Sequence, residues 1–196
     1  MKHMSNLYII AGPNGAGKTT ASFTILPEIF NCKEFVNADE IARGISPFQA
    51  ETVAIEAGRI MLKRIDELLA QRVDFSFETT LSSRTYVHTI RKAHENNYQV
   101  TLVYFWLETP DLAVERVKER VSEGGHDISE LVIRRRFESG LKNLFELYLP
   151  LMDYWVIINN SMRPYQIIAE SAKSQFSTGL INEIRAKLKF KPYGNK

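Results

Sequence analysis

Short runs of apolar residues alternate along this chain with longer segments in which apolar residues recur every three or four positions. Such short runs are typical of buried strands, and the three-to-four spacing is typical of helices that pack one face against a sheet. Five runs without proline predict strands at residues 7–11, 34–37, 73–79, 99–107 and 154–159, and residues 165–169 predict a further edge strand. The alternation favours an α/β fold around a mostly parallel sheet of five or six strands.

Capping residues and prolines mark where the helices begin. The predicted starts are Ser46 with Pro47, Ser83 before residues 86–94, and Thr109 with Pro110 before residues 112–121. The last long helix carries an apolar stripe at steps of four and three residues, formed by Phe137, Leu141, Leu144, Tyr148 and Leu151. This stripe predicts the face that packs on the core. Arg134 lies beside the stripe one turn earlier, so its charge requires an anionic partner.

Composition narrows the class of protein. Hydrophobic residues make up 44% of the 196 residues and charged residues 24%. The chain can therefore bury a core, and we expect one folded domain over residues 1–196. The single cysteine, Cys32, cannot form a disulfide within the chain, which favours a reducing compartment and a cytoplasmic location. The apolar run at residues 7–11 is too short for a signal peptide or a membrane span, so no membrane partner is expected.

The balance of charge does not indicate a nucleic-acid partner. The 25 basic and 23 acidic residues leave a formal net charge of only +2. Basic residues gather only near the C-terminus, at Arg185, Lys187, Lys189, Lys191 and Lys196. We interpret this cluster as a solvated helix face.

A glycine-rich string directly after the first predicted strand carries the strongest signal of function. It follows the P-loop pattern G-x-x-x-x-G-K-S/T and precedes a helical segment, as phosphate binding requires. The predicted nucleotide-binding residues are Gly12, Pro13, Asn14, Gly15, Ala16, Gly17, Lys18, Thr19 and Thr20. Backbone N–H groups and the helix N-terminus would bind phosphate, Lys18 would contact the outer phosphates, and Thr19 would ligate Mg²⁺. The string predicts ATP and Mg²⁺ as cofactors.

Two large classes of P-loop protein do not fit the sequence. The guanine-binding N-K-x-D motif of GTPases is missing, because the only Asn-Lys pair is Asn195-Lys196 at the end of the chain. The L-S-G-G-Q signature of ABC ATPases is missing as well, since the nearest string is Leu-Ser-Ser-Arg at residues 81–84. The compact P-loop kinases remain, with a P-loop NTPase fold of the nucleotide-kinase type in three α/β/α layers and a helical lid.

Two carboxylates follow predicted strands at the sheet edge where open α/β sheets bind ligands. Asp39 could accept the proton of a substrate hydroxyl and orient it toward the γ-phosphate, although it could instead cap the helix beginning at Glu40. Glu78 could hold Mg²⁺ through water or contact the acceptor. With Thr79 in the polar loop that follows, these three are the predicted acceptor-binding residues.

Arginines flank a glycine-containing segment at residues 123–127, which predicts a lid over about residues 110–136. Arg120 on the first lid helix, with Arg134 and Arg136 on the second, could neutralise charge on the transferring phosphoryl group. Arg116 shares the flank of Arg120, and Arg135 lies in the second run. The alternative is ordinary surface ion pairs with Glu115, Glu119, Glu123 and Glu138. His126 lacks partners at metal-ligand spacing.

Five strings together resemble the small zeta-toxin-like P-loop kinases of bacteria: residues 11–20, 36–42, 77–82, 120–126 and 133–137, within a region of about residues 5–161. The resemblance implies ATP-dependent phosphorylation of a hydroxyl, with Lys18 on phosphate, Asp39 as base, and Glu78 at the acceptor. It places Arg120 and an arginine of the 134–136 run in the lid. The best-known members phosphorylate UDP-N-acetylglucosamine and are inhibited by a small antitoxin, but they are larger, and the Gly-Gly-His lid belongs to a shorter branch.

Three functions therefore stay open at the level of sequence. The first is a kinase for a small metabolite, with a nucleotide sugar as the leading acceptor. The second is a polynucleotide or nucleoside kinase, which uses the same P-loop, base and lid. The third is a regulatory ATP-binding module without phosphotransfer, which Asp39 and Glu78 argue against.

Overall fold

The structure, a computed structural model, describes residues 4–125 and 127–171. In chain order its elements are β1 (Ser5–Ala11), α1 (Lys18–Glu28), β2 (Phe35–Val36), α2 (Ala38–Ile45), the 3₁₀ helix η1 (Ala50–Val53), α3 (Ala54–Gln71), β3 (Phe75–Thr79), α4 (Tyr86–Glu95), β4 (Tyr98–Trp106), α5 (Pro110–Ser122), α6 (Glu130–Asn143), the π-helical turn η2 (Leu144–Tyr148), the 3₁₀ turn η3 (Leu149–Leu151), β5 (Tyr154–Asn159) and β6 (Gln166–Glu170). Strands thus alternate with helices, as the apolar pattern predicts.

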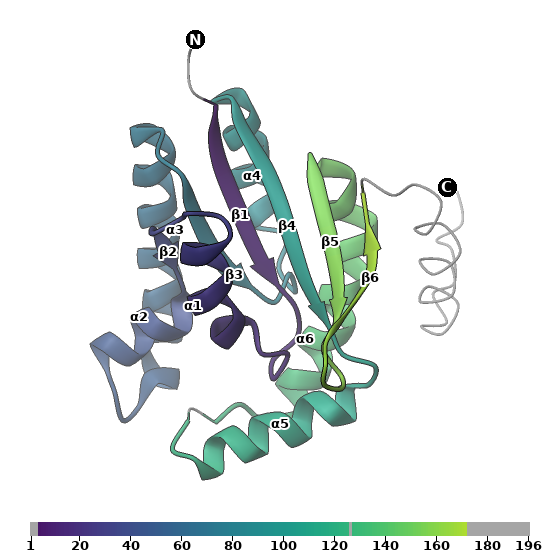
Figure 1. The fold of residues 1–196 in the computed structure, drawn as a ribbon. Coiled ribbons are helices and arrows are strands. Elements are labelled where there is room, and N and C mark those ends of the chain that lie inside the picture. Colours follow the sequence, from purple (N-terminus) through teal and green to yellow (C-terminus); the bar gives the residue numbers. More distant parts are fainter. Residues whose placement is uncertain (1–3, 126, 172–196) are drawn as a thin grey trace, which may run out of the picture.

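The strands form one six-stranded sheet in the order β2-β3-β1-β4-β5-β6. Neighbours from β2 to β5 run parallel, and β6 pairs antiparallel with β5. Helices cover both faces, with α1 in front of the sheet and α4 and α6 behind it in the view of Figure 1. The predicted class, a P-loop kinase fold of three layers with a mostly parallel sheet, is confirmed.

The central strands are buried on both faces, because helices pack on each side of them. Leu7, Ile9 and Ile10 of β1 are fully buried, and so are Phe75 and Phe77 of β3. β1 therefore reads as a continuous apolar run, whereas β3 places the buried Ser76 between its two phenylalanines. The carboxyl ends of β1, β2, β3 and β4 meet at one edge, and the P-loop follows β1 there.

Most predicted elements are confirmed, with one wrong helix start. Thr109 caps α5 through a hydrogen bond from the Leu112 amide (3.2 Å), with Pro110 in the first turn as expected. At Ser46 and Pro47, however, no helix begins: α2 ends at Ile45 and the next helical turn starts at Ala50. A residue before proline is pushed out of the helical region, and Ser46 has φ −139° and ψ 85°. The pair therefore ends one helix rather than starting the next.

The predicted apolar stripe of the last long helix is confirmed for α6 and the turn after it. Phe137, Leu141, Leu144 and Tyr148 are buried, and Leu151 is partly buried. His126 and the basic cluster at residues 185–196 lie outside the described residues. In the part of the chain that the structure describes, no helix combines the length and the apolarity that a membrane span needs.

Candidate active site

The P-loop wraps the start of α1, with Gly17 as the residue before the helix. Gly17 has φ 77°, and a Cβ atom there would come within 2.9 Å of the Asn160 amide nitrogen. Only glycine avoids both the left-handed strain and this contact. Asn160 follows β5 and donates a hydrogen bond from Nδ2 to the Ala16 carbonyl oxygen (2.9 Å). The loop that follows β1 is thus held by the segment after β5, and β4 lies between these two strands in the sheet. The N–H groups of the first turn of α1 have no intrahelical partners.

Three predicted site residues converge just inside the loop. The buried Lys18 ammonium donates to the Pro13 carbonyl oxygen (2.9 Å) and lies 3.5 Å from Oε1 of Glu78. The Thr19 hydroxyl donates to Oε2 of the same carboxylate (2.8 Å). Glu78 is the last residue but one of β3 and lies opposite Ile10 of the parallel strand β1, close to where the P-loop begins. The structure therefore brings the predicted phosphate and magnesium residues into one cluster.

Asp39 stands at the second position of α2 with an exposed side chain. The alternative role considered for it, capping of this helix, belongs instead to Asn37. The Asn37 side chain accepts hydrogen bonds from the amides of Asp39 (2.8 Å) and Glu40 (3.4 Å). Within the described residues the Asp39 carboxylate has no hydrogen bond or ion pair. It is therefore available to a ligand.

The polar loop after β3 is fastened from α6. The Asn143 amide donates to the Leu81 carbonyl oxygen (2.8 Å), and the Tyr148 hydroxyl donates to the Ser83 carbonyl oxygen. Gly140 permits this contact, because a Cβ atom there would collide with the Thr80 carbonyl oxygen. Arg136 lies one turn before Gly140 on the same helix face. The close approach of α6 therefore carries Arg136 to the loop that follows Glu78.

A hollow of about 210 Å³ lies between these parts, and we call it the acceptor hollow. Its lining comes from the P-loop, α2, the end of β3, the following loop, α4 and α6: Asn14, Lys18, Asn37, Ala38, Asp39, Glu78, Thr79, Thr80, Ser82, Ser83, Tyr86 and Arg136. Burial raises the pKa of the Tyr86 phenol, and its hydroxyl donates to Sδ of Met61 (3.6 Å). The guanidinium of Arg136 has no hydrogen bond or ion pair within the described residues, so a cation faces the hollow without a counter-ion.

The other predicted lid arginines lie elsewhere. Arg134 donates to Glu130 (2.9 Å) and to Asp111 (2.6 Å), and these carboxylates are the anionic partners that its position required. They hold Arg134 at a separate hollow lined by α5 and α6, and Arg134 does not line the acceptor hollow. Its place at the phosphates stays a prediction. Arg120 is half-buried on α5 and packs against Gly125, and it does not line the acceptor hollow.

A second hollow of about 200 Å³ lies on the opposite flank of the P-loop, and we call it the base-side hollow. It is lined by α1, β4, β5 and the loop before β6: Gly17, Thr20, Ala21, Thr24, Ile25, Phe105, Ile158, Asn160, Arg163 and Tyr165. Arg116 of the lid fixes one wall by donating to the carbonyl oxygens of Asn160 (2.8 Å) and Ser161 (3.0 Å). Sequence reasoning missed Asn160, Arg163 and Tyr165. The one signal for them was the position of Asn160 directly after a predicted strand.

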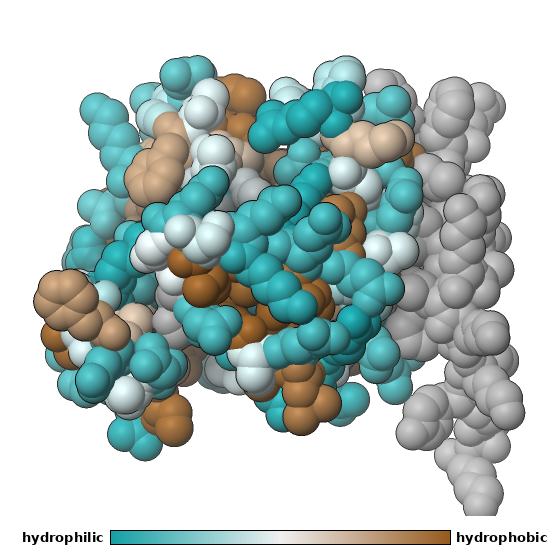
Figure 2. Space-filling model, turned by 90° about the horizontal axis from the view of Figure 1, so that it is seen from below, coloured by the Kyte–Doolittle hydropathy of each residue, from teal (hydrophilic) through white to brown (hydrophobic). Residues whose placement is uncertain are grey.

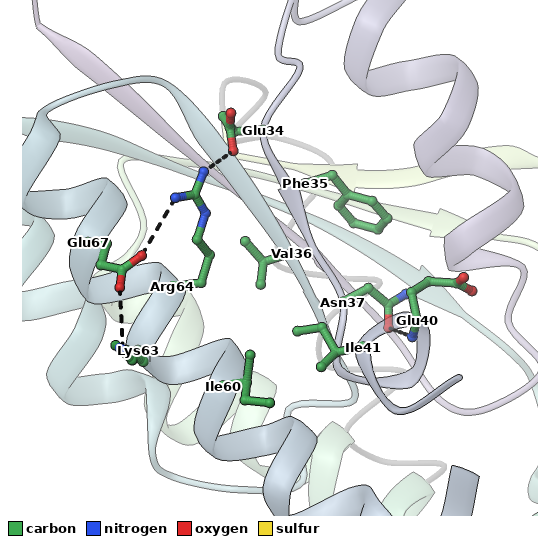
Figure 3. A pocket seen from close by; sticks show the side chains of 10 residues that line it. All are labelled: Glu34, Phe35, Val36, Asn37, Glu40, Ile41, Ile60, Lys63, Arg64 and Glu67. Carbon is green, nitrogen blue, oxygen red and sulfur yellow. Dashed lines mark hydrogen bonds and ion pairs between the residues drawn. The ribbon is translucent and has the colours of Figure 1, made fainter. Parts of the chain in front are cut away.

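Two further hollows open away from the P-loop. One of about 570 Å³ lies beyond β2, between α2 and α3, with an ion pair between Arg64 and Glu34 (2.8 Å) at its rim (Figure 3). The other, of about 500 Å³, lies between the turn after α2 and the lid segment with Gly124 and Gly125. Phe48 borders it with 97% of its side chain exposed. Figure 2, which views the sheet edge that carries the P-loop, shows polar side chains over most of this face and a few apolar groups between them.

The residues around the P-loop fit a magnesium ion. Mg²⁺ prefers hard oxygen donors, keeps several waters and uses few protein ligands alongside phosphates. Thr19 and Glu78 supply a hydroxyl and a carboxylate at hydrogen-bond distance from each other. Among the described residues, no cluster of three or more His, Cys, Asp or Glu side chains could enclose a metal ion. The donor set thus suits a nucleotide-bound Mg²⁺ better than a protein-enclosed metal.

Comparisons with known proteins agree with this geometry. The family model described as "Zeta toxin" matches residues 3–149. A Haemophilus influenzae protein described as uncharacterized is 30% identical over 129 residues, 64% of this chain and 88% of that protein. The solved structure of the PezAT chromosomal toxin-antitoxin system of Streptococcus pneumoniae is 17% identical with a TM-score of 0.66, covering 96% of this chain and 86% of that one. The AvrRxo1-ORF1:-ORF2 structure with ATP is 16% identical with a TM-score of 0.72, and the match covers 99% of this chain and 67% of that one.

At such low identity the two structures establish likeness of fold. The family model, in contrast, spans most of the chain and includes the P-loop, Asp39, Glu78 and the lid arginines. It confirms the resemblance carried by the five sequence strings. The chain belongs to the zeta toxin family, and its fold is that of the P-loop kinases.

Proposed function

We propose that this protein transfers the γ-phosphate of ATP to a hydroxyl group of a small metabolite. One observation carries the proposal: Lys18, Glu78, Asp39 and Arg136 come from four separate segments and line one hollow beside the P-loop. A regulatory ATP-binding module would need the P-loop alone. An unpaired carboxylate and an unpaired guanidinium that line the same polar hollow suit the phosphorylation of a hydroxyl.

Each residue then has a distinct task. The P-loop amides and Lys18 bind the phosphates, and Mg²⁺ near Thr19 and Glu78 would neutralise charge on the β and γ oxygens. Asp39 orients the acceptor hydroxyl and takes its proton as the new O–P bond forms and the bond to the ADP oxygen breaks. Arg136 stabilises negative charge on the transferring phosphoryl group. We assign Arg120 to the same task in a lid that closes over ATP, where it would approach the phosphates.

The base-side hollow suits the nucleoside part of ATP. It begins at Gly17 and Thr20, directly behind the phosphate-binding turn, and its walls are mainly apolar. Arg163 and Tyr165 present planar groups on which a base can stack. A nucleotide whose phosphates lie on the P-loop would therefore point its γ-phosphate toward the acceptor hollow and its base away from it.

The volumes of the acceptor hollow and of the hollow beside Phe48 support an acceptor with two parts, one for each hollow. The acceptor hollow, at about 210 Å³, is small for a ligand site and is lined by hydroxyls and amides that suit a sugar ring. Arg43 lies four residues after Asp39 on the same side of α2 and borders the hollow of about 500 Å³ beside Phe48. A nucleotide sugar such as UDP-N-acetylglucosamine would place its ring near Asp39 and its base near Phe48.

A panel of acceptors with radiolabelled ATP tests the proposal. The panel contains UDP-N-acetylglucosamine, free N-acetylglucosamine, nucleosides and 5′-hydroxyl oligonucleotides, and Lys18→Ala is the inactive control. We expect Mg²⁺-dependent label on the nucleotide sugar. Label on the oligonucleotide or nucleoside alone would favour the second kinase class. Tight MgATP binding with no labelled product from the whole panel would support the regulatory module.

We also propose a small antitoxin protein as a partner, because a similar solved structure is that of a toxin-antitoxin system. Expression of the chain in a bacterial host should then slow growth, whereas the Asp39→Asn variant should not. Equal growth with both proteins would remove the basis for a toxin. A pull-down from the source organism, with the tagged variant as bait, would identify the partner.

A further inference from the structure

Asn37 connects β2 to α2 and uses both ends of its side-chain amide. The side chain is 5% exposed. Its oxygen accepts from the backbone amides of Asp39 and Glu40 at the start of α2, and Figure 3 shows the bond to Glu40. Its nitrogen donates to Oε2 of Glu78 (3.0 Å). One buried amide therefore touches both the helix that carries Asp39 and the carboxylate beside the P-loop.

These contacts connect the phosphate side of the site, which contains Glu78, with the acceptor side, which contains Asp39. Glu78 accepts from Thr19 and lies near Lys18, so its carboxylate belongs to the phosphate side. The Asp39 carboxylate has no bond of its own within the described residues, so its place depends on where α2 begins. β2 pairs with β3 through Phe35 with Ser76 and Val36 with Phe77, and Ser76 also donates to the Glu34 carbonyl oxygen. The strand pairing ends at Val36, so the Asn37 side chain makes the next contact between this segment and β3.

We propose that Asn37 is a positioning residue that couples the phosphate side of the site to the acceptor side. It directs the Glu78 carboxylate toward the nucleotide and fixes the first turn of α2, and with it Asp39, relative to that carboxylate. The proposal rests on the proposed function in one respect, the assignment of Glu78 to the nucleotide and of Asp39 to the acceptor. It adds a residue to which sequence reasoning gave no role.

The residue type separates this role from ordinary helix capping. Ser and Asp cap helices about as well as Asn, so a cap alone does not require an amide. A hydroxyl also carries a donor and an acceptor, but on one atom close to the backbone, whereas the Asn37 amide accepts at Oδ1 from the helix and donates from a separate atom, Nδ2, to the Glu78 carboxylate. Aspartate at this position would cap α2 but would bring a second negative charge against Glu78. Serine would cap α2 and leave Glu78 without this donor.

The experiment measures ATP binding by calorimetry with Mg²⁺ and with a chelator, and melting temperature, for wild type, Asn37→Ser and Asn37→Asp. Thr109→Ser, at the N-cap of α5, is the matched control. For Asn37→Ser we expect a melting temperature within a few degrees of wild type and unchanged affinity for metal-free ATP. The gain in affinity on adding Mg²⁺ should fall about tenfold, the order of a lost hydrogen bond to a charged group. Asn37→Asp should lose more, because its charge repels Glu78 and the phosphates.

A double-mutant cycle with Glu78→Gln decides whether Asn37 acts through Glu78. If it does, Asn37→Ser should change the magnesium-dependent gain by less than twofold once Glu78 is replaced. Additive effects, or a gain in Asn37→Ser that stays within twofold of wild type, would overturn the proposal. The measurements need no acceptor, so a wild type that binds MgATP but phosphorylates nothing would refute the proposed kinase and leave the coupling result standing.

Discussion

The two hollows that flank the P-loop are nearly equal in volume, about 210 and 200 Å³, but differ in chemistry. The acceptor hollow gathers charged groups and hydroxyls from six segments of the chain. The base-side hollow is walled by α1, two strands and a loop, and its walls are mainly apolar, although Asn160 and Arg163 are among the lining residues. Negative charge that develops during phosphoryl transfer is stabilised by charged groups held in place beside it. The nucleoside does not change during the reaction, so a surface of complementary shape is sufficient to bind it. Residues of the acceptor hollow should therefore control turnover, and those of the base-side hollow should control ATP binding.

The largest effect that separates the two sides should come from Asp39→Asn. Turnover should fall about 10² to 10⁴-fold, because the amide cannot accept the hydroxyl proton. Affinity for MgATP should change by less than about threefold, since the P-loop contacts do not include Asp39. Steady-state kinetics and calorimetry measure the two quantities, and Glu40→Gln on the same turn is the matched control. Turnover that survives in Asp39→Asn would move the role of base to Glu78.

Arg136→Ala should lower turnover about 10²-fold, the order expected when a donor to transition-state charge is removed. Arg134→Ala removes the same charge from the same helix, and its guanidinium already pairs with Asp111 and Glu130. It should leave turnover within about threefold, because exposed ion pairs contribute little. Equal losses of turnover in both variants would show that Arg134 also reaches the phosphates when the lid moves. That result would contradict the assignment of this role to Arg136 alone.

The acceptor hollow could largely be predicted from the sequence, because its residues sit in patterned positions. Lys18 belongs to a motif, and Asp39 and Glu78 each follow an apolar run that reads as a strand. Parallel strands bring their carboxyl ends to one edge, so the sequence order already implies their proximity. The choice among the arginines could not be predicted. It depends on how closely α6 approaches Thr80 at Gly140, which is a matter of packing rather than of periodicity.

No motif or strand pattern in the sequence predicted the residues that line the base-side hollow. Arg163 and Tyr165 lie in a short loop whose residue types are ordinary for a surface. Their place beside Thr20 arises because the loop between β5 and β6 borders the same hollow as α1. Likewise, Ser46 and Pro47 read as a helix start, since the same residues serve at either end of a helix. Local sequence thus predicted elements and motifs, whereas contacts between loops distant in the chain required the structure.

Phe48→Ala tests whether the acceptor extends beyond the acceptor hollow. If the second part of a nucleotide sugar stacks on Phe48, its KM should rise about tenfold with little change in turnover. The KM for ATP should not change. Ile55→Ala, which truncates another exposed apolar residue of the same region, is the control. An unchanged KM for the acceptor in Phe48→Ala would restrict the acceptor to a compact molecule that fits in about 210 Å³.

The smallest effect should come from the base side, at Tyr165→Ala. This side chain is 59% exposed, so its truncation leaves no buried cavity, and the melting temperature should stay within about 1 °C. Loss of a stacking surface should raise the KM for ATP about three- to tenfold and leave turnover at saturating ATP unchanged, because base contacts are equal in the ground and transition states. Ile167→Ala, an exposed neighbour that does not line the hollow, is the control. A fall in turnover without a change in the KM for ATP would mean that the adenine base binds elsewhere. The assignment of ATP binding to one hollow and of phosphoryl transfer to the other would then be wrong.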